Sequence, residues 1–350
     1  MLDGSRLRFY TAVVIPFPLM ILKRLAPFLV RPAWAVALLV VAGCGIAPQL
    51  PPAVGPGELP KVIAPAAGKA SYTRCVQTKP DTFVMQTGGQ VFRHRSGRGP
   101  EVVLLGSIHI GEAAYYRDLQ RRMDAADAVL YEQVIDEKQP LSALTPEQRA
   151  ARQAASTYAK VARMMGLYPQ HSQLAYHRRH YQRCDLTVQQ MHALLDAEVA
   201  AGGKTGRDAK QAAADSDTLR QALHGESWVV NFALWLADRS TAVKTRLKFR
   251  LVVSSAKSDG RLKVSPRLSQ LITEDRNHHV IQELARQLRR RPQVPQFLIF
   301  YGAAHLPGMA QELRGIGYTP AGPVEWLTAV TSHPYAGGLD RDEVRRMTAP

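Results

Sequence analysis

The sequence predicts an α/β protein with a mixed central sheet, in which two strands end in the same turn and a large helical segment is inserted. Two apolar strands each run into a glycine, two small or apolar residues and a histidine, first at Gly106–His109 and again at Gly302–His305. The segment 101–134 reads strand–helix–strand, a unit that favours parallel strands. Residues from about 145 to 255 show helical patterning and are expected to form the insertion.

The remaining elements follow from local patterning. Residues 82–95 hold Thr87-Gly88-Gly89-Gln90 between two strand-like runs, which predicts a hairpin with a glycine turn. Apolar side chains recur at helical spacing between residues 112 and 126. Further elements are expected at 128–134 (strand), 276–291 (helix), 296–301 (strand), 305–315 (helix) and near 325–330 (strands).

These elements form one α/β domain at residues 71–333. The helical insertion begins with Thr145-Pro146-Glu147-Gln148, which is typical of a helix start. Gly202–Gly206 contains Gly-Lys-Thr, but the upstream glycine of a phosphate-binding loop is missing and no strand precedes it, which argues against a nucleotide site. Residues 334–350 are expected to form a flexible tail.

The net charge of +16 is unusual in a chain with an ordinary content of 46% hydrophobic and 21% charged residues. A basic balance suits nucleic acid, an anionic membrane surface or solubility alone. No nucleic-acid recognition module is visible, and the basic residues lie on helices scattered along the chain, so no nucleic-acid partner is expected. A basic face against anionic lipid fits the N-terminal sequence better.

Residues 1–43 have the layout of an export signal peptide, with basic residues before a short apolar run. The ending Val-Ala-Gly-Cys at 41–44 resembles a bacterial lipobox, in which Cys44 is lipidated and becomes the new N-terminus. A start at Met20 would give a signal of ordinary length. A transmembrane anchor, or an extension upstream of the true start, are the alternatives.

Residues 44–70 are expected to be the lipidated cysteine and a tether, because 45–68 carry six prolines and show no hydrophobic period. Acyl chains on Cys44 would hold the protein on a membrane. Gly45 resembles the residue that follows the cysteine in outer-membrane lipoproteins. We therefore expect a lipid-anchored protein of the cell envelope, at the outer membrane and facing the periplasm of a Gram-negative cell.

Two further cysteines, Cys75 and Cys184, would meet an oxidising compartment if the protein is exported. A bridge between them would close a loop of more than a hundred residues and stabilise the fold by about 4–5 kcal/mol on the chain-entropy model. Two unrelated buried thiols are the alternative, because spacing alone does not fix disulfide geometry.

His109 and His305 are each expected where a buried strand ends and a helix begins. Ligand sites gather at the carboxyl ends of strands in open α/β sheets, and imidazole suits both metal ligation and proton transfer near neutral pH. If the two strands are neighbours, their ends make one two-histidine site. Ser107, inside the first turn, could hydrogen-bond a ligand or cap the following helix.

Glu132 and Arg276 extend this hypothesis. Glu132 lies in the apolar strand at 128–134, where a buried carboxylate is costly unless it is paired or ligating. The alternative is that Glu132 is exposed to solvent at the end of the strand or at an edge of the sheet. Arg276 opens the predicted helix at 276–291, where the positive dipole end mildly disfavours a cation. A buried anionic partner would explain Arg276 better than an ordinary surface position.

The combination of two Gly-x-x-His turns after strands, a strand glutamate and an Arg-Asn helix start resembles the TraB/GumN/PrgY family. That family is related to the TIKI proteins, and the wider group includes erythromycin-esterase-like proteins and ChaN-like haem-binding lipoproteins. The resemblance covers roughly residues 80–330 and is carried by the two turns, Glu132 and Arg276. The family's usual glycine before the second histidine is Ala304 here.

This resemblance implies a metal-dependent hydrolase of the peptidase type, with manganese or cobalt and a peptide or small-molecule substrate. It implies that His109, His305 and Glu132 ligate the metal, which would activate a bound water. Arg276 would bind a substrate carboxylate or steady the oxyanion. Substrate contacts are expected from Gly106, Ser107, Gly302 and Asn277.

Three other hypotheses stay open. A metal-free hydrolase would use histidine as its general base, as in the esterase-like relatives. A haem-binding lipoprotein would use the segment 171–181, whose histidines, tyrosines and arginines are expected on a helix, together with His278 and His279. A solvated basic helix face is the simpler interpretation of that segment. A regulator that sequesters a secreted peptide without cutting it is the third.

Overall fold

The computed structural model describes residues 50–53, 55, 57–63, 71–137, 157–202, 214–215, 238–257 and 265–349. The strands are β1 (Lys61–Ile63), β2 (Thr73–Lys79), β3 (Thr82–His94), β4 (Glu101–Ser107), β5 (Ile110–Gly111), β6 (Ala128–Tyr131), β7 (Tyr168–Pro169), β8 (Tyr181–Arg183), β9 (Gln296–Gly302), β10 (Tyr318–Pro320) and β11 (Glu325–Ser332). The helices are α3 (Ala113–Ala125), α5 (Thr157–Met164), α6 (Val188–Gly202), α9 (Thr241–Lys257), α10 (Pro266–Gln270), α11 (Arg276–Arg290), α12 (Leu306–Gly315) and α13 (Arg341–Thr348), with a 3-10 turn at Gln170–Ser172 and a π-helical turn at Leu271–Asp275. No helix in these ranges is long and apolar enough to cross a membrane.

The central sheet is mixed, as the sequence predicts. Its strands run in the order β1-β2-β3-β4-β9-β6-β8, and β10 and β11 both pair with β3. Strands β4, β9, β6 and β8 are mutually parallel, whereas β3 is antiparallel to each of its neighbours. The two strands that lead into the histidine turns, β4 and β9, are adjacent, so their carboxyl ends lie side by side.

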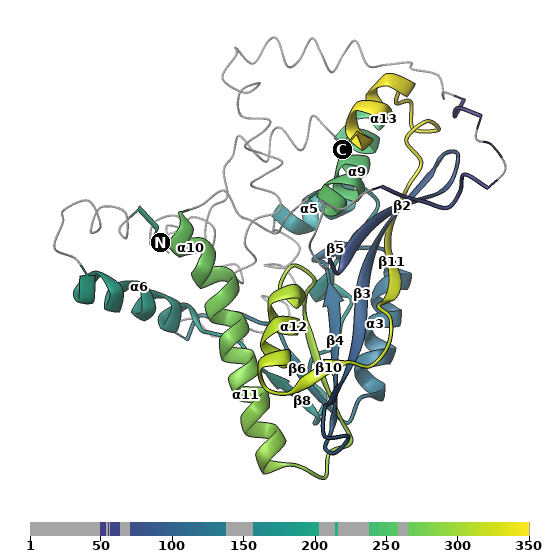
Figure 1. Ribbon diagram of the computed structural model, residues 1–350. Coiled ribbons are helices and arrows are strands. Elements are labelled where there is room, and N and C mark those ends of the chain that lie inside the picture. Colours follow the sequence, from purple (N-terminus) through teal and green to yellow (C-terminus); the bar gives the residue numbers. More distant parts are fainter. Residues whose placement is uncertain are drawn as a thin grey trace, which may run out of the picture.

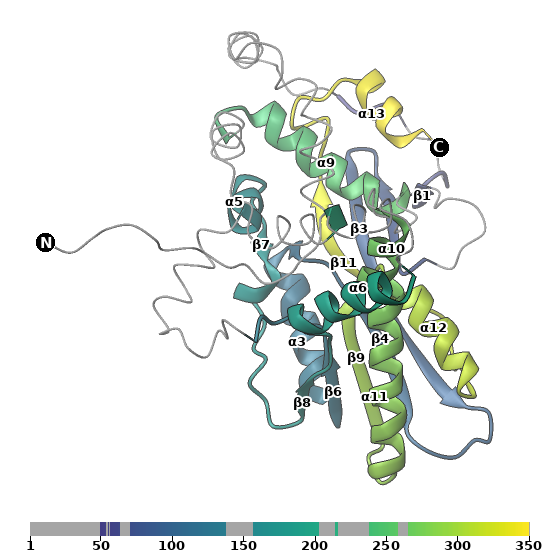
Figure 2. The same ribbon diagram turned by 90° about the vertical axis from the view of Figure 1, so that its left-hand side faces the viewer.

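Helices cover both faces of the sheet (Figures 1 and 2). On one face α3 and α9 pack against the antiparallel strands, and on the other α12 contacts β4 and packs beside α11. Leu105 and Phe300 belong to the first core, and Leu104 and Ile299 to the second. Because both faces are covered, β4 and β9 are apolar without interruption, as buried parallel strands usually are.

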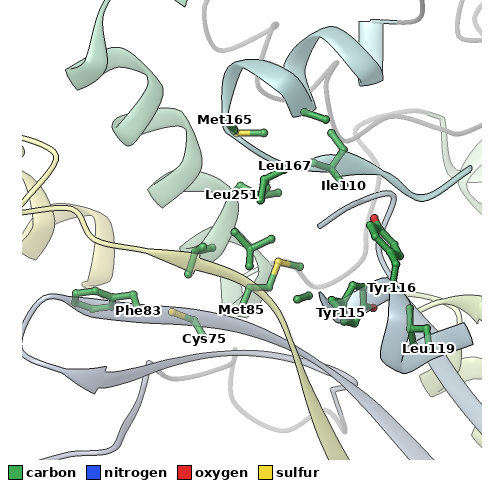
Figure 3. Close-up of a cluster of buried hydrophobic side chains, with 14 of the residues drawn as sticks. Cys75, Phe83, Met85, Ile110, Tyr115, Tyr116, Leu119, Met165, Leu167 and Leu251 are labelled. Carbon is green, nitrogen blue, oxygen red and sulfur yellow. The ribbon is translucent and has the colours of Figure 1, made fainter. Parts of the chain in front are cut away.

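The first core combines aromatic, sulfur-containing and aliphatic side chains of α3, α9 and several strands. Figure 3 shows Tyr115, Tyr116 and Leu119 of α3 in the same buried cluster as Met85 of β3 and Leu251 of α9, with Tyr115 beside Met85. These α3 residues, with Met123, are buried on one face of the helix at the spacing that the sequence shows. This packing fixes the start of α3, and with it the turn that carries His109.

The predicted hairpin at 82–95 is wrong, because β3 is a single strand of 13 residues. Gly88 lies in its middle, where an added Cβ would lie 2.5 Å from Cγ1 of Val324 and 3.1 Å from Cδ1 of Tyr72. The glycine therefore admits closely packed neighbours instead of forming a turn, which is a common role of glycine inside a strand.

The segment 145–255 is not helical throughout. It contains α5, α6 and α9, but also β7 and β8, and β8 extends the parallel part of the sheet beside β6. Strands of two and three residues are too short to show a period of two in the sequence, which explains why the pattern missed them.

Two expectations about the ends of the chain are wrong. The tail after residue 334 is ordered, because Asp340 caps α13 by accepting a hydrogen bond from the amide of Glu343 at 2.7 Å, and Leu339 and Val344 are buried. Within the predicted tether, β1 pairs with β2 and buries Ile63. Isolated buried residues among charged or proline-rich neighbours give no readable period.

Of the two alternatives for the cysteines, the structure shows two separate buried thiols and no disulfide, since Cys75 and Cys184 are both free and buried. Cys75 lies on β2 and Cys184 directly follows β8, and these strands are five places apart in the sheet. At about 4.8 Å between neighbouring strands, the thiols are separated by roughly 24 Å. A bridge requires Cα atoms within about 7 Å of one another.

Residues 1–49 and Gly203–Gly206 lie outside the described ranges. The signal peptide, the lipidation of Cys44 and the location in the cell envelope therefore stay predictions.

Candidate functional site

The two Gly-x-x-His turns meet at the carboxyl edge of the sheet. Ser107 at the end of β4 lies opposite Gly302 at the end of β9, and the amide of Ala303 donates to the carbonyl of Ser107 at 2.8 Å. A Cβ on Gly106 would lie only 3.0 Å from that of Ala303, so glycine lets the two turns pack together. This adjacency brings both histidines into one polar cluster.

His305 has a fixed ring and a fixed protonation state. Its Nδ1 lies 2.8 Å from Oδ1 of Asn277, whose Nδ2 donates to the carbonyl of His305 at 3.3 Å. This pair of bonds assigns the proton to Nδ1 and leaves a lone pair on Nε2. Burial and the nearby cation of Arg276 lower the pKa of His305 to about 4, so its imidazole is neutral at physiological pH.

Glu132 follows β6 and points both carboxylate oxygens at donors. Oε1 accepts from Nη2 of Arg276 at 2.6 Å, and Oε2 accepts from the amide of Gly302 at 2.6 Å. Burial alone would raise the pKa of Glu132, but Arg276, the two histidines and this amide hold it at about 2. A Cβ on Gly302 would lie 3.2 Å from Oε2, so a larger residue would crowd the carboxylate.

Arg276 is buried and paired with two carboxylates. Its Nε and Nη2 donate to Asp185 at 2.8 and 2.7 Å, and Nη2 also donates to Glu132. Its Nη1 lies 3.4 Å from Nε2 of His305. Only 4% of the side chain of Arg276 is exposed, which favours the buried-partner explanation over an ordinary surface charge.

The position of Arg276 in its helix differs from the expectation. It does not open a helix, because α10, the π-helical turn and α11 run on without a break over residues 266–290. The π-helical turn ends directly before Arg276, and such turns are frequent at functional sites because they redirect side chains. Here the consecutive residues Arg276 and Asn277 both face the buried cluster.

His109 is more accessible than His305. It is partly buried, and a two-stranded ribbon of β5 and β7 holds its turn, with the amide of Gln170 donating to the carbonyl of His109 at 2.8 Å. Burial lowers the pKa of His109, an effect that Glu132 and the side chain of Gln170 partly oppose. His171 lies near His109, and burial together with the His109 ring lowers the pKa of His171.

Asp185 is the site residue that the sequence did not reveal. Its side chain is fully buried, and Oδ1 also accepts from the amide of Leu186 at 2.9 Å. Burial raises the pKa of Asp185 in spite of its ion pair with Arg276. A lone aspartate in the run Cys184–Val188, between a short strand and a helix, was the available indication.

The residues expected to contact substrate have varied surroundings. Asn277 orients His305, and the amide of Gly302 is used by Glu132. Ser107 is buried, and within the described part of the chain its hydroxyl has no hydrogen-bond partner. Ala304 is exposed, so the methyl group that replaces the family's usual glycine points away from the packed interior.

The residues as arranged do not fit the predicted metal. Both oxygens of Glu132 are engaged, and the free lone pair of His305 faces the guanidinium of Arg276, so a divalent cation would meet a fixed positive charge. Among the described residues, no group of three or more His, Cys, Asp or Glu side chains could hold a metal ion.

The segment proposed for haem is not a helix. Residues 171–181 form the end of a 3-10 turn, a loop and the first residue of β8. Arg178 pairs with Asp124 at 3.2 Å, and the hydroxyl of Tyr181 donates to the same carboxylate at 2.7 Å. These side chains support the end of α3 and do not form a helical face for a cofactor.

Comparisons with known proteins returned no matching family model, no matching curated protein and no matching solved structure. The resemblance to the TraB/GumN/PrgY family stays a prediction from the motifs.

Proposed function

We propose that this protein is a hydrolase whose active site lies at the carboxyl edge of the sheet. It cleaves an amide or ester bond of a peptide or small molecule. The observation that carries the proposal is the convergence of two neutral histidines and an ionised glutamate around a buried arginine. Titratable groups whose pKa values are moved by burial and by specific partners are typical of catalytic sites.

His109 is the general base in this proposal. It is neutral at pH 7 and partly accessible, so it can take a proton from a water molecule that attacks the substrate carbonyl carbon. The protonated imidazole then returns that proton to the leaving group. The negative charge of Glu132 stabilises the imidazolium between these two steps, because it favours the charged form of His109.

Arg276 and Asp185 act as positioning residues. Arg276 makes the largest contribution to the low pKa of Glu132, which is about 2, so Glu132 is ionised at neutral pH. The two-pronged bond to Asp185 fixes the guanidinium plane. His305 is a poor base at neutral pH because its pKa is about 4. Its neutral ring fills the space beside Arg276 and Glu132 without adding a second positive charge.

A metal-independent reaction suits this geometry better than a metal-dependent one, because Arg276 occupies the position that a ligated cation would need. The family resemblance still implies manganese or cobalt, so both forms are tested together. A panel of peptides, esters and amides is incubated with the full chain, with EDTA or with added Mn²⁺ or Co²⁺.

We expect hydrolysis that survives EDTA and is lost in His109→Gln. His94→Gln is the matched control, since His94 lies at the far end of β3 and outside the cluster. Hydrolysis that appears only with Mn²⁺ or Co²⁺ would instead support the metal-dependent form. The absence of hydrolysis under all conditions, or full activity in His109→Gln, would refute the proposed hydrolase.

A further inference from the structure

The edge of the sheet opposite the candidate site gathers arginines from several elements. The parallel strands begin here, and α3, α11 and α12 end here, because each helix runs antiparallel to its strands. The turn between β3 and β4 and the loop before β8 lie at the same edge. Figure 1 shows the end of α11 and the β3–β4 turn at the bottom of the molecule, far from α13 at the top. We call this surface the amino edge.

Six exposed arginines define the amino edge. They come from the β3–β4 turn, the loop before β8 and the last turns of α11 and α12: Arg95, Arg98, Arg179, Arg289, Arg290 and Arg314. No carboxylate of the described residues forms an ion pair with any of them. Asp127, directly before β6, is an exposed carboxylate at this edge. Other acidic side chains nearby already have cationic partners, as in the pairs Arg93–Glu101, Arg178–Asp124 and Arg286–Glu283.

Helix dipoles explain only part of this charge. Arginines in the last turn stabilise the negative end of a helix, which accounts for Arg289, Arg290 and Arg314. Arg95 lies in a loop but also serves a helix end, because its Nη2 donates to the carbonyl of Arg314 in the last turn of α12 at 3.4 Å. Arg98 and Arg179 lie in loops and receive no such benefit. Like charges that gather without carboxylate partners repel one another, so their position calls for an external anion.

We propose that the amino edge binds the surface of an anionic phospholipid bilayer. Guanidinium groups form paired hydrogen bonds with phosphate, and each basic residue near an anionic leaflet strengthens binding roughly five-fold. The arginines spread from β3 to β8 on both faces of the sheet, a breadth of roughly 20 Å at about 4.8 Å per strand. Such a broad end suits a flat surface better than a strand of nucleic acid.

The exposed hydrophobic side chains agree with this partner. Single-stranded nucleic acids are bound through aromatic side chains that stack on bases. Of the large exposed hydrophobic residues in the described ranges, only Ile316 lies at the amino edge, beside Arg314, and it is aliphatic. An aliphatic side chain among arginines suits the boundary between headgroups and acyl chains.

This contact would turn the candidate site away from the bilayer, because the two histidine turns are at the opposite edge of the same strands. The described chain before β1 lies at the other end of the molecule, because the carbonyl of Leu50 accepts a hydrogen bond from Arg341 of α13 at 3.5 Å. The contact through the amino edge is therefore proposed independently of a lipid on Cys44.

The test is sedimentation of the full chain with vesicles, in a Cys44→Ser background so that acylation cannot contribute. Vesicles of phosphatidylglycerol and phosphatidylcholine are compared with vesicles of phosphatidylcholine alone. We expect binding to the anionic vesicles that is lost at high salt, and roughly thirty-fold or more weaker binding for Arg289→Glu/Arg290→Glu.

The matched control is Arg345→Glu/Arg346→Glu on α13, which changes the net charge equally at the other end of the molecule. Arg95→Glu/Arg98→Glu repeats the test on a separate element, and circular dichroism checks that each variant folds. Equal weakening by the α13 control would show a nonspecific charge effect and overturn the proposal. Binding to oligonucleotides but not to anionic vesicles would overturn the lipid partner.

Discussion

The two Gly-x-x-His turns share a sequence pattern but hold their histidines in different ways. His305 is locked by Asn277, buried beside Arg276 and followed at once by α12. His109 is partly exposed, and the small β5–β7 ribbon separates it from α3. The same strand-to-helix turn therefore gives one structural histidine and one accessible histidine. We infer that the difference assigns proton transfer to His109.

The largest expected effect is a loss of hydrolysis on substitution of His109, which substitution of His305 should not match. His109→Gln should lower hydrolysis by about 10²–10⁴-fold, the usual contribution of a general base, while the free energy of unfolding changes little. His305→Gln should lower the free energy of unfolding by about 1–3 kcal/mol, because it disturbs a buried hydrogen bond. Initial rates and urea unfolding of both variants check this. The reverse assignment of the two effects would contradict the comparison.

Removal of Arg276 should have the largest effect on stability. Arg276→Met leaves Glu132 and Asp185 buried without their cation, which should cost about 3–5 kcal/mol in urea unfolding. Arg267→Met is the matched control, since its pair with Asp275 on the same continuous helix is partly exposed. That control should lose less than about 1 kcal/mol. Similar losses in both variants would argue against a specific role for the buried triad.

The depressed pKa of His305 should appear in the pH dependence of stability. Its value is about 4 in the folded protein and 6.5 in the reference state, so the unfolded chain binds the proton more tightly. The full stability is present above pH 6.5 and should fall by about 3 kcal/mol as the pH drops to 4. His109 adds to the same window, and Glu132 acts only below about pH 4.5.

Urea unfolding between pH 4 and 8 measures this slope for the wild type and for His305→Gln. The variant should retain the parts that His109, His171 and His279 contribute, since burial lowers the pKa of each of these rings as well. An unchanged slope in His305→Gln would mean that His305 is not held neutral by its surroundings.

The smallest expected effect is a change in the pKa of each histidine when a neighbouring side chain that affects its ring is replaced. Asn277→Leu removes the acceptor for Nδ1 of His305, and Gln170→Leu removes the side chain that favours the charged form of His109. Each change should move the pKa of its own histidine by about one unit or less and leave the other unchanged. Proton NMR titration of the imidazoles follows both. A shift of both rings in one variant would show that the two turns are not independent.

The sequence predicted much of the fold because long apolar strands and amphipathic helices carry a readable period. The strands β4 and β9, the helices α3, α11 and α12, and the placement of both histidines were all visible in this way. Short elements were not, which is why β7 and β8 were missed. Gly88 misled the prediction, since a glycine that admits a close neighbour looks the same in sequence as one that makes a turn.

By itself, the sequence determined that two histidines and a glutamate stand at the ends of apolar strands, and it singled out Arg276 but placed it wrongly at the start of a helix. It could not determine their partners, because the decisive bonds join residues far apart in the chain, as Arg276 with Asp185 and Glu132 with Gly302. Local patterns carry no record of such contacts. Only the order of strands in the sheet decided that β4 and β9 are neighbours, that the two thiols lie on opposite sides, and that the arginines collect at the amino edge.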